Sequence, residues 1–281
     1  KSIPQRRYPI RFPVNPRVLS MKEITNIDEV RCLRGNLSAG SKLGFVPTMG
    51  ALHEGHVSLI SESIKANDRT ILSIFVNPTQ FNDPKDLRSY PSNLKKDLEI
   101  AEKAGVDFVF LPRHQDVYKD DFEYQIHETR LSKELCGADR PGHFTGVLTV
   151  VMKLLNLIAP DRAYFGLKDF QQYELIRGMC EAFFLNVEIC AVETIRDSKG
   201  LAISSRNRLL NHESKEMACK LNKTLSLDTH DEAIHELLEE LGFTVNYVET
   251  RKGRRFGSVT ISSNENEIRL IDNIKLEDSY Q

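Results

Sequence analysis

The segment "PTMGALHEGH" (47–56) contains two histidines, His53 and His56, that lie three residues apart. At this spacing the two imidazoles share one face at the start of a helix. A helix N-terminus offers free N–H groups and positive potential to a phosphate, and imidazoles can stabilise the charge that develops during attack on phosphorus. Gly50 and Gly55 allow the backbone to approach a ligand closely. The segment therefore indicates phosphate chemistry, with a plain turn carrying two exposed histidines as the alternative.

Three later segments, "FVNPTQF", "YFGLKDFQQ" and "GLAISSRN", contain further polar side chains of the kinds that bind such substrates. The candidates are Asn77, Gln80, Gly166, Lys168, Asp169, Gln172, Ser204, Ser205 and Arg206. Neutral amides can bind hydroxyl or carboxylate groups, and Lys168 can reach a phosphate as a point charge. The "GLAISSRN" segment is expected to be a lid that closes over a triphosphate, with Arg206 neutralising charge in the transition state.

Each of these segments also has a purely structural interpretation. Asn-Pro commonly opens a loop, and Asp169 with Gln172 matches a helix capping box. Ser-Ser-Arg alone fits a linker followed by a helix cap. "ADRPGHFTGV" adds Arg140 and His143, which form either a second polar wall or only a loop with a Pro-Gly turn.

Strand-like and helix-like segments alternate along the first two thirds of the chain. Apolar strands are predicted at 42–48, 69–78, 106–112, 162–166 and 186–193, and helices at 23–37, 53–67, 93–105, 144–160 and 169–184. This alternation predicts an α/β fold with a doubly wound, Rossmann-like parallel sheet. Ligands bind such sheets at the carboxyl ends of the strands. The histidine pair follows the first predicted strand, so we expect the site at this edge.

The end of the chain has a different pattern. Helices are predicted at 204–225 and 231–242, followed by strands at 243–250, 255–262 and 267–272. This order predicts a small α+β C-terminal domain. We therefore divide the chain into an extension over 1–20, a nucleotide- and substrate-binding domain over 21–195, and a lid domain over 196–281. The proline-rich, basic extension is a tag, a leader or a mistranslated start.

Composition excludes several classes of protein. The net charge is −2 over 281 residues, so no basic excess points to a nucleic-acid partner. The most apolar stretch, 146–160, is too short and too polar to span a membrane. Five cysteines form no CxxC pair and no metal-type spacing, which favours a reduced, cytoplasmic setting.

The ordered set "PTMGALHEGH", "SIFVNPTQF", "RPGHFTGVLTVVMKL", "YFGLKDFQQ" and "GLAISSRN" resembles the pantothenate synthetase family, whose first segment is a HIGH-type nucleotidyltransferase motif. The resemblance runs from about Met21 to "IRLIDN" and implies a two-step reaction. ATP and pantoate give an enzyme-bound pantoyl adenylate and pyrophosphate, and the amine of β-alanine then attacks the adenylate to give pantothenate and AMP. The resemblance also implies Mg²⁺ with ATP and a homodimer formed through the first domain.

The resemblance assigns roles residue by residue. ATP is assigned to Met49, Gly50, Ala51, Leu52, His53, Glu54, Gly55, His56, Gly166, Leu167, Lys168, Asp169, Ile195, Ile203, Ser204, Ser205 and Arg206. His56 is the suggested proton donor and His53 contacts the phosphates, while the catalytic set is completed by Lys168, Ser204, Ser205 and Arg206. Gln80 binds pantoate and β-alanine, Gln172 binds pantoate, Pro47 and Asn77 join the substrate site, and Asp97 is the metal contact.

Three alternatives remain at this point. Another adenylyltransferase would keep the histidine pair, but it has no need for both Gln80 and Gln172. A fragment related to aminoacyl-tRNA synthetases would need a basic RNA-binding face, which the near-neutral charge does not supply. A nucleotide-binding regulator would have lost catalytic residues, whereas His53, His56 and Lys168 are present.

Overall fold

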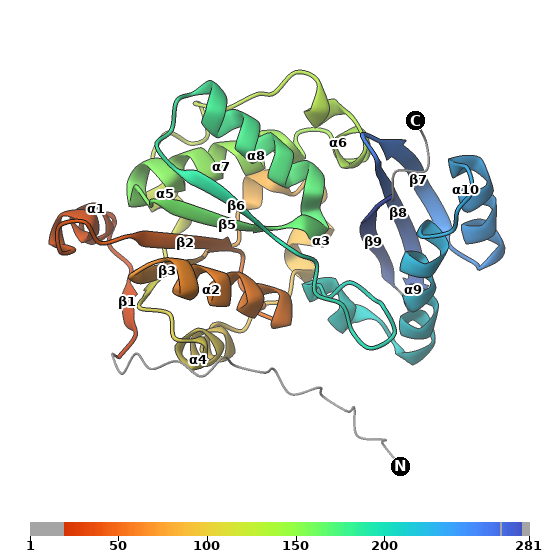
Figure 1. The fold of residues 1–281 in the computed structure, drawn as a ribbon, viewed down its shortest axis with the longest axis horizontal. Coiled ribbons are helices and arrows are strands. Elements are labelled where there is room, and N and C mark those ends of the chain that lie inside the picture. The colour runs from red at the N-terminus through yellow and green to blue at the C-terminus, as the bar shows by residue number, and fades with distance from the viewer. Residues whose placement is uncertain (1–19, 265, 277–281) are drawn as a thin grey trace, which may run out of the picture.

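The computed structural model describes residues 20–264 and 266–276, so the 1–20 extension, apart from Ser20, lies outside the described residues. Within these ranges a six-stranded parallel sheet forms the centre of the larger part of the molecule (Figure 1). In spatial order its strands are β1 (Lys22–Ile24), β4 (Phe108–Phe110), β3 (Arg69–Ile74), β2 (Leu43–Thr48), β5 (Arg162–Gly166) and β6 (Glu188–Val192). The chain winds from β2 through β3 to β4 and then crosses back to β5. The carboxyl ends of β2 and β5 therefore flank the point where the winding reverses, which is where ligands bind such sheets.

Helices cover both faces of this sheet because its strands are apolar on both sides. The longer helices are α1 (Ile27–Asn36), α2 (Glu54–Ala66), α4 (Leu94–Ala104), α7 (His143–Ile158) and α8 (Phe170–Ala182). Side chains of α2 and α4 share one hydrophobic cluster with the sheet, and those of α1, α7 and α8 share another. In Figure 1, α2 and α4 lie on one side of the sheet and α7 and α8 on the other. Short helices connect them: η1 (Pro78–Gln80), α3 (Pro84–Ser89), α5 (His114–Val117), η2 (Leu131–Lys133), α6 (Cys136–Asp139) and η3 (Leu167–Asp169).

The remaining described part forms the predicted α+β unit. It contains η4 (Ser205–Leu209), α9 (His212–Leu225), α10 (Asp231–Glu240) and an antiparallel sheet of β7 (Thr244–Arg251), β8 (Arg254–Ser263) and β9 (Asn266–Lys275). Apolar residues of both helices pack against β8 and β9 in a separate cluster that includes Leu225, Leu238 and Val259. Among the described residues, none of the helices has both the length and the apolar character needed to cross a membrane.

Two predicted helices differ most from the structure, while the predicted strands 69–78 and 106–112 are shortened to Arg69–Ile74 and Phe108–Phe110. The predicted helix 23–37 begins only at Ile27, after an Asn26 side chain that caps it by accepting from the Asp28 N–H. The residues before it form β1, a three-residue edge strand, so the histidine motif follows the second strand rather than the first. The predicted helix 204–225 is divided because Asn211 starts a new helix by accepting from the Ser214 N–H.

Candidate active site

A cleft of about 300 Å³ lies at the carboxyl ends of β2 and β5, and residues of β9 contribute to its wall. Most of the predicted site residues line it: Pro47, Met49, His53, Gly55, His56, Asn77, Gln80, Gly166, Lys168, Asp169, Gln172, Ile195, Ile203, Ser204, Ser205 and Arg206. The lining does not include Gly50, Ala51, Leu52, Glu54, Leu167 or Asp97. The cleft therefore brings together side chains from segments that are far apart in the sequence.

His53 and His56 form the first turn of α2. His53 is the N-cap residue, and its Nδ1 accepts from the Gly55 N–H at 3.2 Å. The His53 N–H in turn donates to Nδ1 of His56 at 3.3 Å, and the two ring centroids lie 4.0 Å apart. Because each Nδ1 is an acceptor, this hydrogen-bond pattern assigns the proton of each neutral ring to Nε2. Both rings thus offer one N–H donor at the cleft.

The surroundings of these rings disfavour their charged form. Burial, opposed by Asp169 and reinforced by the charges of Arg208 and Lys168, lowers the pKa of His56 to about 4. Burial also lowers the pKa of His53 far below its ordinary range, with His56 and Lys168 acting in the same direction. Both imidazoles are therefore neutral at pH 7 before a phosphate enters, and they act as hydrogen-bond donors rather than as cations.

Asp97 supports the loop that precedes α2, and it does so from outside the cleft lining. Its two carboxylate oxygens accept the N–H groups of Ala51 and Leu52, each at 2.8 Å, and the residue is only 2% exposed. Gly50 has a φ of +81°, and a Cβ at this position would lie 2.8 Å from the Asp97 carboxylate. Gly50 therefore makes room for Asp97, whereas the sequence suggested that it makes room for the ligand.

The location of the Asp97 carboxylate does not fit its predicted role as a metal contact. The carboxylate lies outside the cleft lining, and both of its oxygens are used by backbone N–H groups. Among the described residues, no group of three or more His, Cys, Asp or Glu side chains could hold a metal ion. A Mg²⁺ that arrives with ATP needs few protein ligands, because phosphates and water supply the rest. Asp169 is a carboxylate that does line the cleft.

The η1 turn orients Gln80 through a chain of buried polar groups. Asn77 donates from its amide nitrogen to Oε1 of Gln80 at 3.1 Å, and its own Oδ1 accepts from the Tyr118 hydroxyl at 2.8 Å. With its Oε1 occupied in this way, Gln80 retains its amide NH₂ as a donor. Gly146 of α7 allows the helix to pack on this turn, since a Cβ there would lie 2.4 Å from the carbonyl oxygen of Thr79.

His143 and Arg140, which the sequence left undecided, line the cleft and hold the same turn. Nδ1 of His143 donates to the carbonyl oxygen of Gln80 at 2.8 Å, and Arg140 Nη1 lies 3.1 Å from its Nε2. Burial and the charge of Arg140 lower the pKa of His143 to about 3. A neutral His143 that donates from Nδ1 and accepts at Nε2 satisfies both contacts.

The segment after β5 supplies the opposite wall. Lys168 and Gln172 both line the cleft, as their i, i+4 spacing predicted. The neighbouring Gln171 also lines the cleft, but its amide nitrogen is already occupied, because it donates to the carbonyl oxygens of Leu131 and Glu134. The predicted capping box is absent from this helix, since the side chain of Asp169, the N-cap residue of α8, makes no capping hydrogen bond.

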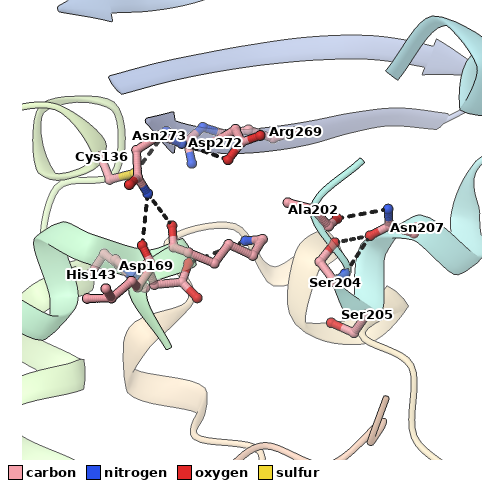
Figure 2. Close-up of polar contacts among 12 residues, drawn as sticks. Cys136, His143, Asp169, Ala202, Ser204, Ser205, Asn207, Arg269, Asp272 and Asn273 are labelled. Atoms are coloured by element: carbon pink, nitrogen blue, oxygen red, sulfur yellow. Dashed lines mark hydrogen bonds and ion pairs between the residues drawn. The ribbon is translucent and has the colours of Figure 1, made fainter. Parts of the chain in front are cut away.

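The predicted lid segment is held by specific contacts. Ser204 is tied to Asn207, whose amide nitrogen donates to the carbonyl oxygen of Ala202 (Figure 2). Arg206 donates to both carboxylate oxygens of Asp86 on α3, at 3.1 and 2.8 Å. Arg206 thus has a carboxylate partner in the structure, and a phosphate would have to compete for it.

Arg208 is a contact that sequence reasoning missed. Its guanidinium donates to the carbonyl oxygens of Ala51 and Leu52, at 3.2 and 2.8 Å, and so joins η4 to the histidine loop. Tyr118 was missed too, because its ring is buried in the core and no motif contains it. The only signal for Arg208 is its position two residues after the predicted Arg206.

The chain resembles one family of known proteins along most of its length. The sequence profile of the family described as Pantoate-beta-alanine ligase matches residues 22–275. The chain belongs to the pantoate-beta-alanine ligase family. Among related ligases, a pantothenate synthetase of Legionella pneumophila (strain Corby) is 47% identical over 256 residues, which cover 91% of this chain and 100% of that protein. A pantothenate synthetase of Bdellovibrio bacteriovorus is 49% identical over 83% of this chain and 92% of its own length.

Solved ligases of this family have the same fold. The crystal structure of the Francisella tularensis pantoate-beta-alanine ligase, complexed with beta-gamma ATP and beta-alanine, matches with a TM-score of 0.86 at 39% identity. The match covers 91% of this chain and 98% of that chain. The pantothenate synthetase of Thermus thermophilus matches with a TM-score of 0.80 at 33% identity, over 91% and 99% of the two chains. The predicted resemblance and the predicted fold class are thereby confirmed.

Proposed function

We propose that this member of the pantoate-beta-alanine ligase family condenses pantoate with β-alanine, using ATP, through an enzyme-bound pantoyl adenylate. The observation that carries the proposal is the single cleft lined by His53, His56, Lys168, Gln80 and Gln172. It combines donors suited to phosphate with amides suited to a hydroxy acid. No side-chain nucleophile is needed, because the carboxylate of pantoate itself attacks the α-phosphorus.

The histidine turn and Lys168 bind the phosphates of ATP in this proposal. The Nε2–H groups of His53 and His56 donate to phosphoryl oxygens, and the N-terminus of α2 adds its dipole. The negative charge of the phosphates raises the pKa of His56 from its low value in the free enzyme. His56 then protonates, or donates a strong hydrogen bond to, the departing pyrophosphate.

In this proposal the 200–207 segment excludes water and, together with Lys168, stabilises charge. Lys168, Ser204, Ser205 and Arg206 act on the pentacoordinate phosphorus, which carries more negative charge than the ground state. To act on the phosphorus, Arg206 must first break its hydrogen bonds to the Asp86 carboxylate. An acyl adenylate hydrolyses readily, so a segment that closes over the cleft protects it until the amine of β-alanine attacks.

The amides select the two acids. Gln80 donates to pantoate and then to β-alanine, and Gln172 donates to pantoate, while Pro47 and Asn77 shape the turn that holds them. Met49, Gly166, Asp169, Ile195 and Ile203 line the ATP side of the cleft, whereas the remaining predicted ATP residues support the loop from outside the lining.

Mg²⁺ accompanies ATP in this proposal and supplies positive charge that neutralises the phosphates. Asp169 is the carboxylate we assign to it, in place of Asp97. We also propose a homodimer formed through the first domain and a cytoplasmic setting. All five cysteines are unpaired thiols, which is consistent with a reduced compartment.

Release of pyrophosphate from ATP, measured with single substrates added in turn, tests the activity. We expect release that depends on pantoate, and AMP with pantothenate only after β-alanine is added. Folded protein that releases no pyrophosphate with pantoate would falsify the proposal. Release that requires a phosphate-bearing acceptor or tRNA would instead favour one of the related nucleotidyltransferases.

His56→Ala tests the assigned donor. We expect pantoate-dependent pyrophosphate release to fall by about 100-fold or more, which is typical of losing one donor to a charged transition state. The matched control is His212→Ala, which removes an exposed histidine at the first turn of α9. Near-normal turnover of a folded His56→Ala protein would overturn the assignment.

A further inference from the structure

Strand β9 carries two adjacent buried polar residues, Asp272 and Asn273, each only 4% exposed. Both line the same cleft as the histidine pair, although they belong to the C-terminal sheet. Neighbouring residues of a strand point to opposite faces, so the two side chains reach different parts of the molecule. Burial of two such groups is costly unless their hydrogen bonds are made.

Asn273 forms hydrogen bonds to the backbone at Lys168 and at the residue before it. Its amide nitrogen donates to the carbonyl oxygens of Leu167 and Lys168, both at 2.9 Å (Figure 2). Its Oδ1 accepts from Arg254 at 2.5 Å, which fixes the orientation of the amide. A side-chain amide has two N–H groups and can therefore bridge two successive carbonyls, which a carboxylate of the same shape cannot do.

Asp272 holds the base of the segment that carries Ser204 and Arg206. Its carboxylate accepts from both terminal nitrogens of Arg196, at 2.6 and 2.8 Å. Arg196 also pairs with Ala202 in an isolated β-bridge, which closes the loop just before Ile203. This bidentate pair is the geometry in which an arginine is held most firmly by a carboxylate.

The hydrogen bonds of Asp272 and of Asn273 thus reach two different walls of the cleft from adjacent positions in β9. One wall of the ATP site, residues 166–169, is fixed by Asn273, and the other, residues 196–206, is fixed by Asp272. In Figure 2 the Asn273 contacts and the Ser204–Asn207 contacts lie on opposite sides of the view. The Lys168 amine pairs with Asp169 at 3.5 Å, so Asn273 fixes the lysine backbone without contacting the amine.

We propose that Asn273 is a positioning residue for Lys168, and that the C-terminal sheet sets the distance between the two walls of the ATP site. The proposal rests on the ATP-dependent activity assigned above. Displacing a phosphate-binding group by a small distance weakens catalysis even when every catalytic side chain is present.

Pantoate-dependent exchange of pyrophosphate into ATP isolates the first reaction step and tests the proposal. We expect Asn273→Ala to raise the KM for ATP and to lower the exchange rate by about tenfold, with the KM for pantoate unchanged. Asn273→Asp, which keeps the shape but loses both donors, has at least the same effect. Asn246→Ala is the matched control, because the Asn246 side chain contacts the Ser258 and Thr260 hydroxyls of the same sheet.

A double-mutant cycle separates positioning from simple destabilisation. If Asn273 acts through Lys168, then Asn273→Ala adds little to the defect of Lys168→Ala. Full additivity of the two defects, or unchanged exchange kinetics in Asn273→Ala, would overturn the proposal. If Asn273→Ala fails to fold, Asn273→Ser retains one donor, and the same cycle is run with it. Absence of exchange in the parent protein would contradict the assigned activity, which is a separate outcome.

Discussion

At the scale of single residues, three histidines of the cleft are neutral for the same physical reason. Burial lowers the pKa of each of them, and neighbouring cations reinforce the effect. In the unfolded chain each would titrate near pH 6.5. Between the lowered pKa and about pH 6.5 the unfolded state therefore binds more protons, so the free energy of unfolding rises with pH in this window.

His143→Asn makes this linkage measurable. The amide of Asn can donate to the Gln80 carbonyl without titrating, so we expect a smaller loss of stability on acidification. Below about pH 6 the slope of unfolding free energy against pH falls by about 1.4 kcal/mol per pH unit relative to the parent. Urea unfolding between about pH 7 and about pH 5 measures the slope. His212→Asn, at an exposed position, is expected to leave it unchanged, and an unchanged slope in His143→Asn would contradict a buried neutral histidine.

At the scale of elements, the order of the longer helices and strands follows from the sequence because each buries a regular apolar pattern. β5 matches its predicted range, and α2 and α4 differ from theirs by one residue at each end. β1 was missed because three residues at a sheet edge bury too little to leave a pattern. The contacts of Asn273 with Leu167 and Lys168 and the Arg206–Asp86 pair were missed for another reason. Each joins segments more than 100 residues apart, and no local rule predicts such a partner.

Helix α4 supports the histidine loop through Asp97, and Asp97→Asn tests this role against metal binding. The amide of Asn can accept one of the two N–H groups but opposes the other, so we expect a loss of about 1–3 kcal/mol in unfolding free energy. The Mg²⁺ concentration that gives half-maximal activity is expected to stay unchanged. Glu99→Gln, on an exposed face of the same helix, is the control. An increase of about tenfold or more in the required Mg²⁺ would restore Asp97 as a ligand.

At the scale of the whole molecule, the two sheets are connected by polar contacts around the cleft. Arg269 pairs with Asp139 at 2.9 Å, and Arg251 pairs with Glu134. Contacts of this kind are partly exposed, and each contributes little on its own. Phosphates would also compete with Asp86 for Arg206, so we expect the part of the lid segment around Arg206 to change its contacts when ligands fill the cleft.

Limited trypsin digestion tests this closure. We expect ATP and pantoate together to slow cleavage after Lys199 by about fivefold or more, because ligand binding stabilises the closed segment. ATP or pantoate alone is expected to protect less. Cleavage after Lys252, in the exposed turn between β7 and β8, serves as the internal control. Equal cleavage after Lys199 with and without both ligands would count against a lid.

The position of Asn273 in the chain has a consequence for how the enzyme is made. The strands of the parallel sheet end at Val192, so that sheet, with the histidine turn and Lys168, leaves the ribosome long before β9 does. Until Asn266–Lys275 emerges, the carbonyls of Leu167 and Lys168 lack the amide that bridges them. A nascent or shortened chain that stops ahead of β9 would therefore display every recognisable motif and yet hold its ATP site unassembled. On the proposed role of Asn273, the two walls of the site therefore take their final separation only once β9 is in place.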